Sequence, residues 1–252
     1  MIELVQKLYE PHIQAARARL GSDPEIRALV DPGIEPLVLE RFLIQYTALG
    51  VRMTEPVEGW IRRAGERCVA LGLEEVGQKL MSHARHEAGH HLLMVNDTRY
   101  LVARWNARHG AAAALDAEAL LGQAPPAPVL AYVKLHEDTI ASDTPEGQVA
   151  IEFEIERLSL EIGAPFVANC QRVLGAEIMK GMTFVTEHVE LDEGHTALNE
   201  RMLGRLLAMR PERAQALAQT GAEALRIYGA FLASCLDAGR RAVGGGRAAL
   251  AS

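Results

Sequence analysis

The stretch HVELDEGH, residues 188–195, places His188, Asp192 and His195 at i, i+4 and i+7. Side chains at these intervals lie on one face of an α-helix, within an arc of about 60°. Apolar residues continue this face in the neighbouring turns, so it faces a core, where three ionisable groups are costly unless something compensates them. Imidazole and carboxylate are natural metal ligands. We therefore predict a helix over 178–209 that carries metal ligands; a hydrogen-bonded His–Asp–His cluster is the alternative.

A second stretch, HARHEAGH at residues 83–90, repeats the pattern with Glu in place of Asp. Glu87 and His90 form the E-x-x-H pair that di-iron helical bundles use to present a carboxylate beside a nitrogen ligand. His83 lies one turn before Glu87. Three roles are open for it: a metal ligand, a residue that hydrogen-bonds a ligand, or a histidine of the core. We favour the second role. Asp97 is a candidate to orient His90, because ligating histidines usually donate their other N–H to an acceptor.

Apolar residues recur with a helical period along almost the whole chain, and no stretch alternates with period two. The pattern predicts an all-α, single-domain bundle of about seven helices over residues 1–240, followed by a flexible Gly- and Ala-rich tail over 241–252. The predicted helices cover 2–20, 35–66, 72–108, 128–142, 146–175, 178–209 and 212–240.

One further acidic residue interrupts an apolar face in the helix predicted over 35–66. Glu55 follows Ala48 and Val51 at seven and four residues, so it lies on their face. Glu58 and Glu40 are less well placed alternatives. The alternative to metal binding is that Glu55 forms an ion pair with a nearby arginine. We predict Glu55 as a metal ligand.

Another acidic residue interrupts the apolar face of the helix predicted over 146–175. Ile151 and Ile155 belong to this face, and Glu154 falls inside it. Glu156 lies to one side and is the next candidate. We choose Glu154.

These residues together predict one site built from four helices. Four carboxylates and three histidines exceed what one ion needs and suit two irons or manganeses that share a carboxylate. A structural zinc would need only four ligands and usually recruits thiolates. The motifs G-x-S-x-G, GxGxxG and GxxxxGK[ST] are absent, so the sequence offers no nucleophile elbow or phosphate loop. The predicted metal ligands are Glu55, Glu87, His90, Glu154, His188, Asp192 and His195.

Composition limits the partners and the compartment. The formal net charge of −7 argues against nucleic acid and anionic membranes as partners. No apolar run approaches the roughly 20 residues that a membrane span requires, and the first residues lack a signal-peptide core. Three scattered cysteines are expected to be free thiols, so we expect a cytoplasmic protein.

The order of these motifs resembles the heme-oxygenase-like di-iron oxidases. In this chain the order is Glu55, EAGH at 87–90, Glu154 and HVELDEGH at 188–195, which covers most of the sequence. The resemblance implies an up-and-down helical fold with two metal ions between its central helices. A ferritin-like bundle would carry a second E-x-x-H, whereas here the second motif is D-x-x-H with an additional histidine one turn earlier. The chain departs from the pattern at His83, where some relatives carry a carboxylate.

The resemblance also implies dioxygen activation at a labile cofactor of two Fe(II) ions, with manganese as an alternative and O2 as co-substrate. Members of this family N-oxygenate amines or guanidines, or cleave C–C bonds of amino or fatty acids to give alkenes. We expect an enzyme that N-oxygenates a small amine or amino-acid-like molecule in a biosynthetic pathway, with C–C cleavage as the alternative. A non-catalytic iron-binding protein and a cofactor-free, thiaminase-II-like enzyme are further alternatives. The sequence leaves open whether the protein takes electrons from an external donor and whether it forms a homodimer.

Overall fold

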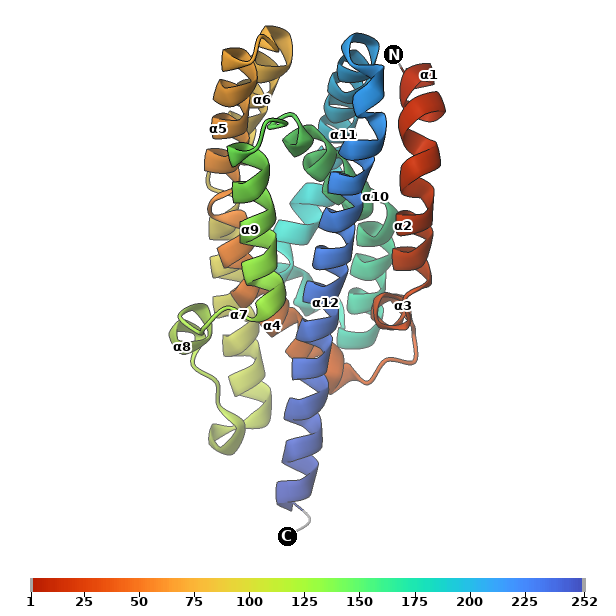
Figure 1. Cartoon of the computed structure of the whole chain (residues 1–252). Helices are drawn as coiled ribbons and strands as arrows, with labels where there is room; N and C mark the ends of the chain where they lie inside the picture. The colour runs from red at the N-terminus through yellow and green to blue at the C-terminus, as the bar shows by residue number, and fades with distance from the viewer. Residues whose placement is uncertain (1, 251–252) are drawn as a thin grey trace.

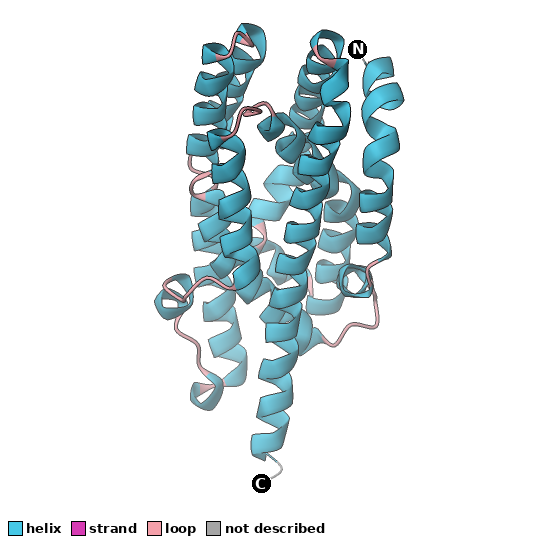
Figure 2. Cartoon of the chain, viewed as in Figure 1, coloured by secondary structure: helices cyan, strands magenta, loops and turns pink. Residues whose placement is uncertain are grey.

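The computed structural model describes residues 2–250, without the side chains of residues 190–193 and 245–250. Within this part, the chain forms helices joined by loops, with no strand (Figure 2). The all-α prediction is therefore confirmed. The count is about eleven helical rods rather than about seven, because two predicted helices are broken and two short helices fill predicted loops.

The N-terminal rod consists of α1 (Ile2–Leu4), a π-helical turn (Val5–Tyr9) and α2 (Glu10–Ser22). A short helix, α3 (Pro24–Val30), follows it. The side chain of Asp23 accepts a hydrogen bond from the amide of Glu25, which satisfies one free donor at the start of α3.

The helix predicted over 35–66 is two helices, α4 (Pro36–Thr54) and α5 (Val57–Ala70). Pro56 lies at the break. A proline inside a helix lacks the amide hydrogen and clashes with the preceding turn, so α4 ends just before it. Glu55 thus lies at the end of a helix rather than along its side.

The helix predicted over 72–108 is also two helices, α6 (Glu74–Glu87) and α7 (His91–His109). Gly89 lies between them with φ of +88°, in the left-handed region that favours glycine. Glu87 therefore ends one helix, and His90 immediately precedes the next.

The remaining predicted helices are present with small shifts of their ends. α12 continues through the region predicted as a flexible tail, 241–252, up to Leu250, and residues 251–252 lie outside the described part. The elements in order are a 3-10 turn (Ala111–Ala113), α8 (Ala117–Leu121), α9 (Ala127–Ala141), α10 (Gly147–Leu174), a 3-10 turn (Ala176–Gly181), α11 (Thr183–Met209), a 3-10 turn (Pro211–Arg213) and α12 (Ala214–Leu250).

The long helices run roughly along one axis, and α1 lies at the opposite end of the molecule from the end of α12 (Figure 1). α10 packs against α11 and α12, while α4 packs against α7 and α12. Their facing side chains form one hydrophobic core, in which Phe42, Trp60, Phe153 and Phe231 are almost completely buried. The three cysteines are buried and form no disulfide. Among the described helices, none combines the length and apolarity that crossing a bilayer requires.

Candidate metal centre

Glu87 lies at the centre of a buried cluster of histidines and carboxylates. Its Oε1 atom is 3.4 Å from Nε2 of His83 and 3.3 Å from Nδ1 of His195. Its Oε2 atom is 3.0 Å from Nδ1 of His90. The two oxygens of one carboxylate therefore face two different groups of ligand atoms.

The first group consists of His83, Glu87, Glu156 and His195, whose ligand atoms all lie within 4.8 Å of one another. Oε1 of Glu156 is 3.2 Å from Nε2 of His83 and 4.0 Å from Nδ1 of His195. The residues come from α6, α10 and α11.

The second group consists of Glu87, His90 and His188, whose ligand atoms also lie within 4.8 Å of one another. Nδ1 of His188 is 2.8 Å from the carbonyl oxygen of Phe184. A carbonyl only accepts, so Nδ1 of His188 carries the hydrogen and its Nε2 keeps the lone pair that a metal ion needs.

The start of α11 is fixed by Asp97. Its carboxylate accepts hydrogen bonds from the amide and hydroxyl of Thr183, at 3.0 and 2.7 Å, and from the amide of Phe184, at 2.9 Å. We expected Asp97 to orient His90; instead it caps the helix that carries His188. The N-terminal amides of a helix have no partner within the helix, so this cap determines where α11 begins.

Asn199 orients the carboxylate of Glu156. Its side-chain amide donates to Oε2 of Glu156 at 2.6 Å, and Asn199 is completely buried. The other oxygen, Oε1, is the one that faces His83 and His195. Asn199 thus fixes which oxygen of Glu156 is available in the first group.

The pKa values show how strongly these groups influence one another. Burial alone would lower the pKa of His83, but the carboxylates of Glu156 and Glu87 raise it to about 10. Burial opposes the charged form of Glu87, yet His83 and His90 lower its pKa well below the usual range. Burial raises the pKa of Glu156. Burial and the positive charge of His83 lower the pKa of His195 to about 4.

The cluster fits a metal better than it fits hydrogen bonds alone. Two carboxylate oxygens converge on Nε2 of His83, but neither meets it with hydrogen-bond geometry. Converging buried carboxylates need a cation between them. A proton on His83 and a metal ion are alternative ways to supply that charge, so metal binding would release the proton.

The structure brings together four of the seven predicted ligands: Glu87, His90, His188 and His195. The side chain of a fifth, Asp192, lies outside the described residues. Glu55, at the end of α4, is exposed and is not part of either group.

Glu154 is also outside the cluster, because other partners bind its carboxylate. Arg17 donates two hydrogen bonds to it, both at 2.7 Å, and the hydroxyl of Tyr9 donates a third at 2.9 Å. Glu156, two residues later and therefore on the opposite side of α10, takes its place in the first group. Our choice of Glu154 over Glu156 is corrected accordingly.

Two residues of the cluster, His83 and Glu156, were predicted only as secondary candidates, and the supporting residue Asn199 was missed. His83 lies in the same repeated motif as Glu87 and His90, which was the available signal. Glu156 carried a weaker signal than Glu154, and Asn199 carried none, because its role depends on the contact between α10 and α11.

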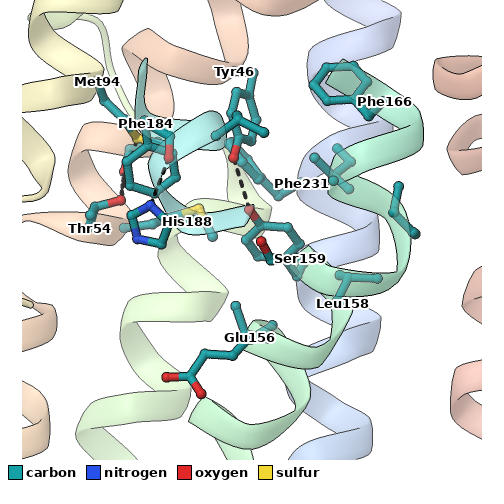
Figure 3. Close-up of a pocket in the computed structure, with 18 of the residues that line it drawn as sticks. Tyr46, Thr54, Met94, Glu156, Leu158, Ser159, Phe166, Phe184, His188 and Phe231 are labelled. Carbon is teal, nitrogen blue, oxygen red and sulfur yellow. Dashed lines mark hydrogen bonds between the residues drawn. The ribbon is translucent and has the colours of Figure 1, made fainter. Parts of the chain in front are cut away.

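A cavity of about 160 Å³ adjoins the cluster. Glu87, Glu152, Glu156 and His188 contribute to its wall. In Figure 3, His188 and Glu156 extend from different helices on one side of the pocket, and Phe166 and Phe231 lie on the other side. Most of the remaining lining is apolar, and no lysine or arginine occurs among the described lining residues. Burial raises the pKa of Glu152 to about 8.

Comparison with known proteins places this cluster in a family context. Residues 41–229 match a family described as iron-containing redox enzymes. The chain belongs to this family. That range contains every member of both ligand groups, from His83 to His195. Comparison with the curated proteins finds no match.

Two solved structures show the same fold. A domain of unknown function with a heme oxygenase-like fold from Shewanella denitrificans OS217 superposes with a TM-score of 0.71 at 16% identity, covering 92% of this chain and 91% of that one. A TenA homolog from Pseudomonas syringae pv. tomato superposes with a TM-score of 0.64 at 18% identity, covering 93% of each chain. The predicted family and the heme-oxygenase-like fold are therefore confirmed.

Proposed function

We propose that this chain is a di-iron oxidoreductase that uses dioxygen to oxidise a small molecule. The observation that carries the proposal is the carboxylate of Glu87, whose two oxygens face two separate sets of histidines. One iron would be held by His83, Glu156 and His195, the other by His90 and His188, with Glu87 shared between them. Asp192 remains a proposed ligand from the same face of α11.

Two ferrous ions in these positions would supply the electrons for reducing dioxygen, which protein side chains cannot do by themselves. The chain's own residues place the ligands and shape the pocket. The carbonyl of Phe184 keeps His188 in the tautomer that presents Nε2, and Asn199 keeps Oε1 of Glu156 turned towards His83. The apolar lining of the cavity excludes water from the substrate.

The favoured reaction is N-oxygenation of a small amine or amino-acid-like molecule in a biosynthetic pathway. Support for this choice comes from the resemblance of the motifs. Glu152 lines the cavity but belongs to neither ligand group, so it offers an acceptor for an amine.

A second reaction, oxidative C–C cleavage of a fatty-acid-like molecule to an alkene, is favoured by one observation. The wall away from the cluster is mostly apolar, its polar groups are hydroxyls, and it carries no described lysine or arginine. Such a wall suits an aliphatic chain and offers no charged partner for a carboxylate, which would then have to face the metal end.

Anaerobic titration with ferrous iron, followed by measurement of oxygen uptake, tests the proposal. We expect two irons per chain and oxygen uptake that depends on iron. Glu87→Gln removes the charge of the shared carboxylate at nearly constant size, so we expect it to lose iron at both positions. Glu55→Gln changes an exposed carboxylate outside both groups and should bind two irons. Binding of one iron or none by the unmodified chain would refute the proposal, and binding of none would favour a cofactor-free enzyme.

A further inference from the structure

A row of aromatic side chains runs along the cavity wall and ends behind it. Tyr46 on α4 and Tyr228 on α12 meet through their hydroxyl oxygens, 3.3 Å apart. The ring centroids of Tyr228 and Tyr132, on α9, are 6.1 Å apart. Tyr132 in turn lies 6.2 Å from Trp60 on α5. We call Tyr46, Tyr228, Tyr132 and Trp60 the aromatic row; its three tyrosines line the cavity, and Trp60 lies behind them.

A second connection joins Trp60 to the metal end of the cavity. The ring of His136 stacks on Trp60 with centroids 4.1 Å apart and planes 8° from parallel. The side-chain amide of Gln148 lies 2.9 Å from Nδ1 of His136 and also donates to Glu152, which lines the cavity. The two amide hydrogens of Gln148 bond Nδ1 of His136 and the carboxylate of Glu152 when His136 is neutral. Burial favours the neutral state by lowering the pKa of His136 to about 3.

The outer end of the aromatic row has a proton acceptor. The indole N–H of Trp60 donates to Oε1 of Glu137 at 2.8 Å. Arg63 donates to both oxygens of Glu137, which lowers the pKa of this carboxyl. Trp60 is 1% exposed, whereas the Glu137 side chain is 47% exposed, so the carboxylate connects a buried indole to solvent.

We propose that Trp60 is an electron donor to the metal centre and that the aromatic row is the path along which the electron travels. The proposal rests on the proposed function, because the oxidant is a one-electron oxidant left at the centre when dioxygen is reduced without substrate. Indole and phenol side chains are oxidised by one electron more readily than imidazole, so the row would be oxidised in place of the ligating histidines.

Trp60 loses one electron, which reduces the oxidant at the centre by one electron. The indole N–H bond breaks, and its proton passes to Glu137, which leaves a neutral indole radical. A thiolate in solution then returns one electron and becomes a thiyl radical, while Glu137 returns the proton.

The chain contains a matched control, because its second tryptophan lies outside the row. Trp105 is 8% exposed, and its indole N–H donates to the carbonyl of Ala113 rather than to a carboxylate. Trp105→Phe therefore leaves Trp60 as the single tryptophan, and Trp60→Phe leaves Trp105. Trp60→Tyr keeps an oxidisable ring beside Glu137. Circular dichroism and thermal unfolding establish that each variant is folded.

The first experiment uses the iron-free chain, so that it does not depend on the proposed function. Pulse radiolysis with the azide radical oxidises indoles, and transient absorption distinguishes indole from phenol radicals. In Trp105→Phe, we expect the Trp60 radical and a tyrosyl radical to interconvert at a rate independent of protein concentration, which shows that an electron passes between Trp60 and the tyrosines of the row. Adding Tyr132→Phe should abolish or markedly slow the conversion. No conversion, or equal conversion in Trp60→Phe, overturns the proposal.

The second experiment exposes the iron-loaded chain to dioxygen without substrate and maps oxygen additions by peptide mass spectrometry. We expect additions at Trp60 and not at Trp105, with ligand oxidation increased in Trp60→Phe and restored to the original level in Trp60→Tyr. Equal oxidation of both tryptophans overturns the proposal. Conversion in the iron-free chain without any oxidation in the iron-loaded chain shows that the row passes electrons but overturns the assignment of Trp60 as donor to the centre. The proposed function is tested separately, by iron stoichiometry and oxygen uptake.

Discussion

Replacing Asn199 with leucine tests whether Glu156 is held ready for a metal. Asn199 is completely buried, and its amide donates to Oε2 of Glu156 at 2.6 Å. A buried hydrogen bond to a charged group contributes about 1.5–3 kcal/mol. Leucine has the same branching as asparagine, although it is larger, and it cannot donate, so Glu156 would lose this hold on its orientation. Because 1.4 kcal/mol corresponds to a factor of ten, iron should bind about 10- to 100-fold more weakly.

Ferrous affinity can be measured by competition with a chelator under anaerobic conditions, and stability by chemical denaturation of the iron-free chain. Asn169→Leu is the matched control, because Asn169 is also buried and donates to the carbonyl of Leu29 at 2.7 Å, in a contact that involves neither ligand group. We expect this control to lower the free energy of unfolding while iron affinity stays unchanged. A folded Asn199→Leu chain with undiminished iron affinity would refute the role assigned to Glu156.

Three further predictions concern stability. Arg17→Met leaves the buried carboxylate of Glu154 without its cation and should lower the free energy of unfolding by about 3–5 kcal/mol, measured by denaturation; a change below 1 kcal/mol would contradict the pairing. Burial lowers the pKa of His136 to about 3, so below about pH 6.5 the unfolded chain takes up a proton that the folded chain refuses. Stability should therefore fall between pH 6.5 and 3, by up to about 1.4 kcal/mol per pH unit, and this contribution should vanish in His136→Phe. Gly77→Ala places a methyl group 2.5 Å from a backbone oxygen of α5 and should destabilise the chain by about 1–3 kcal/mol in thermal unfolding. Gly59→Ala, with nothing within 4 Å, should instead stabilise it slightly.

The helical architecture and part of the cluster could be predicted because both leave a periodic trace in the sequence. His188 and His195 share one face of α11, and the spacing of Glu87 and His90 brings them together even across a helix break. Periodicity does not report such breaks. The single residues Pro56 and Gly89 divide two predicted helices, through a missing amide hydrogen and a positive φ respectively.

The choice between Glu154 and Glu156 could not be made from the pattern. The first two turns of α10 are buried on every side, so an apolar face does not single out one glutamate there. The deciding fact is the position of Arg17, which is 137 residues away in sequence and bonds Glu154 across the bundle. The assignment of Glu55 failed for a local reason, because α4 ends before this residue and leaves it in solvent.

The joint at Gly89 affects how tolerant the centre is of different ions. In an unbroken helix, the backbone ladder would set the separation of Glu87 and His90 rigidly. Here a single long contact, 3.4 Å from the amide of His90 to the carbonyl of Glu87, spans the joint between α6 and α7. Small rotations at the glycine can therefore move one ligand relative to the other without breaking either helix. A joint of this kind gives the centre mechanical compliance, which would let one protein scaffold adapt to cations of unequal radius.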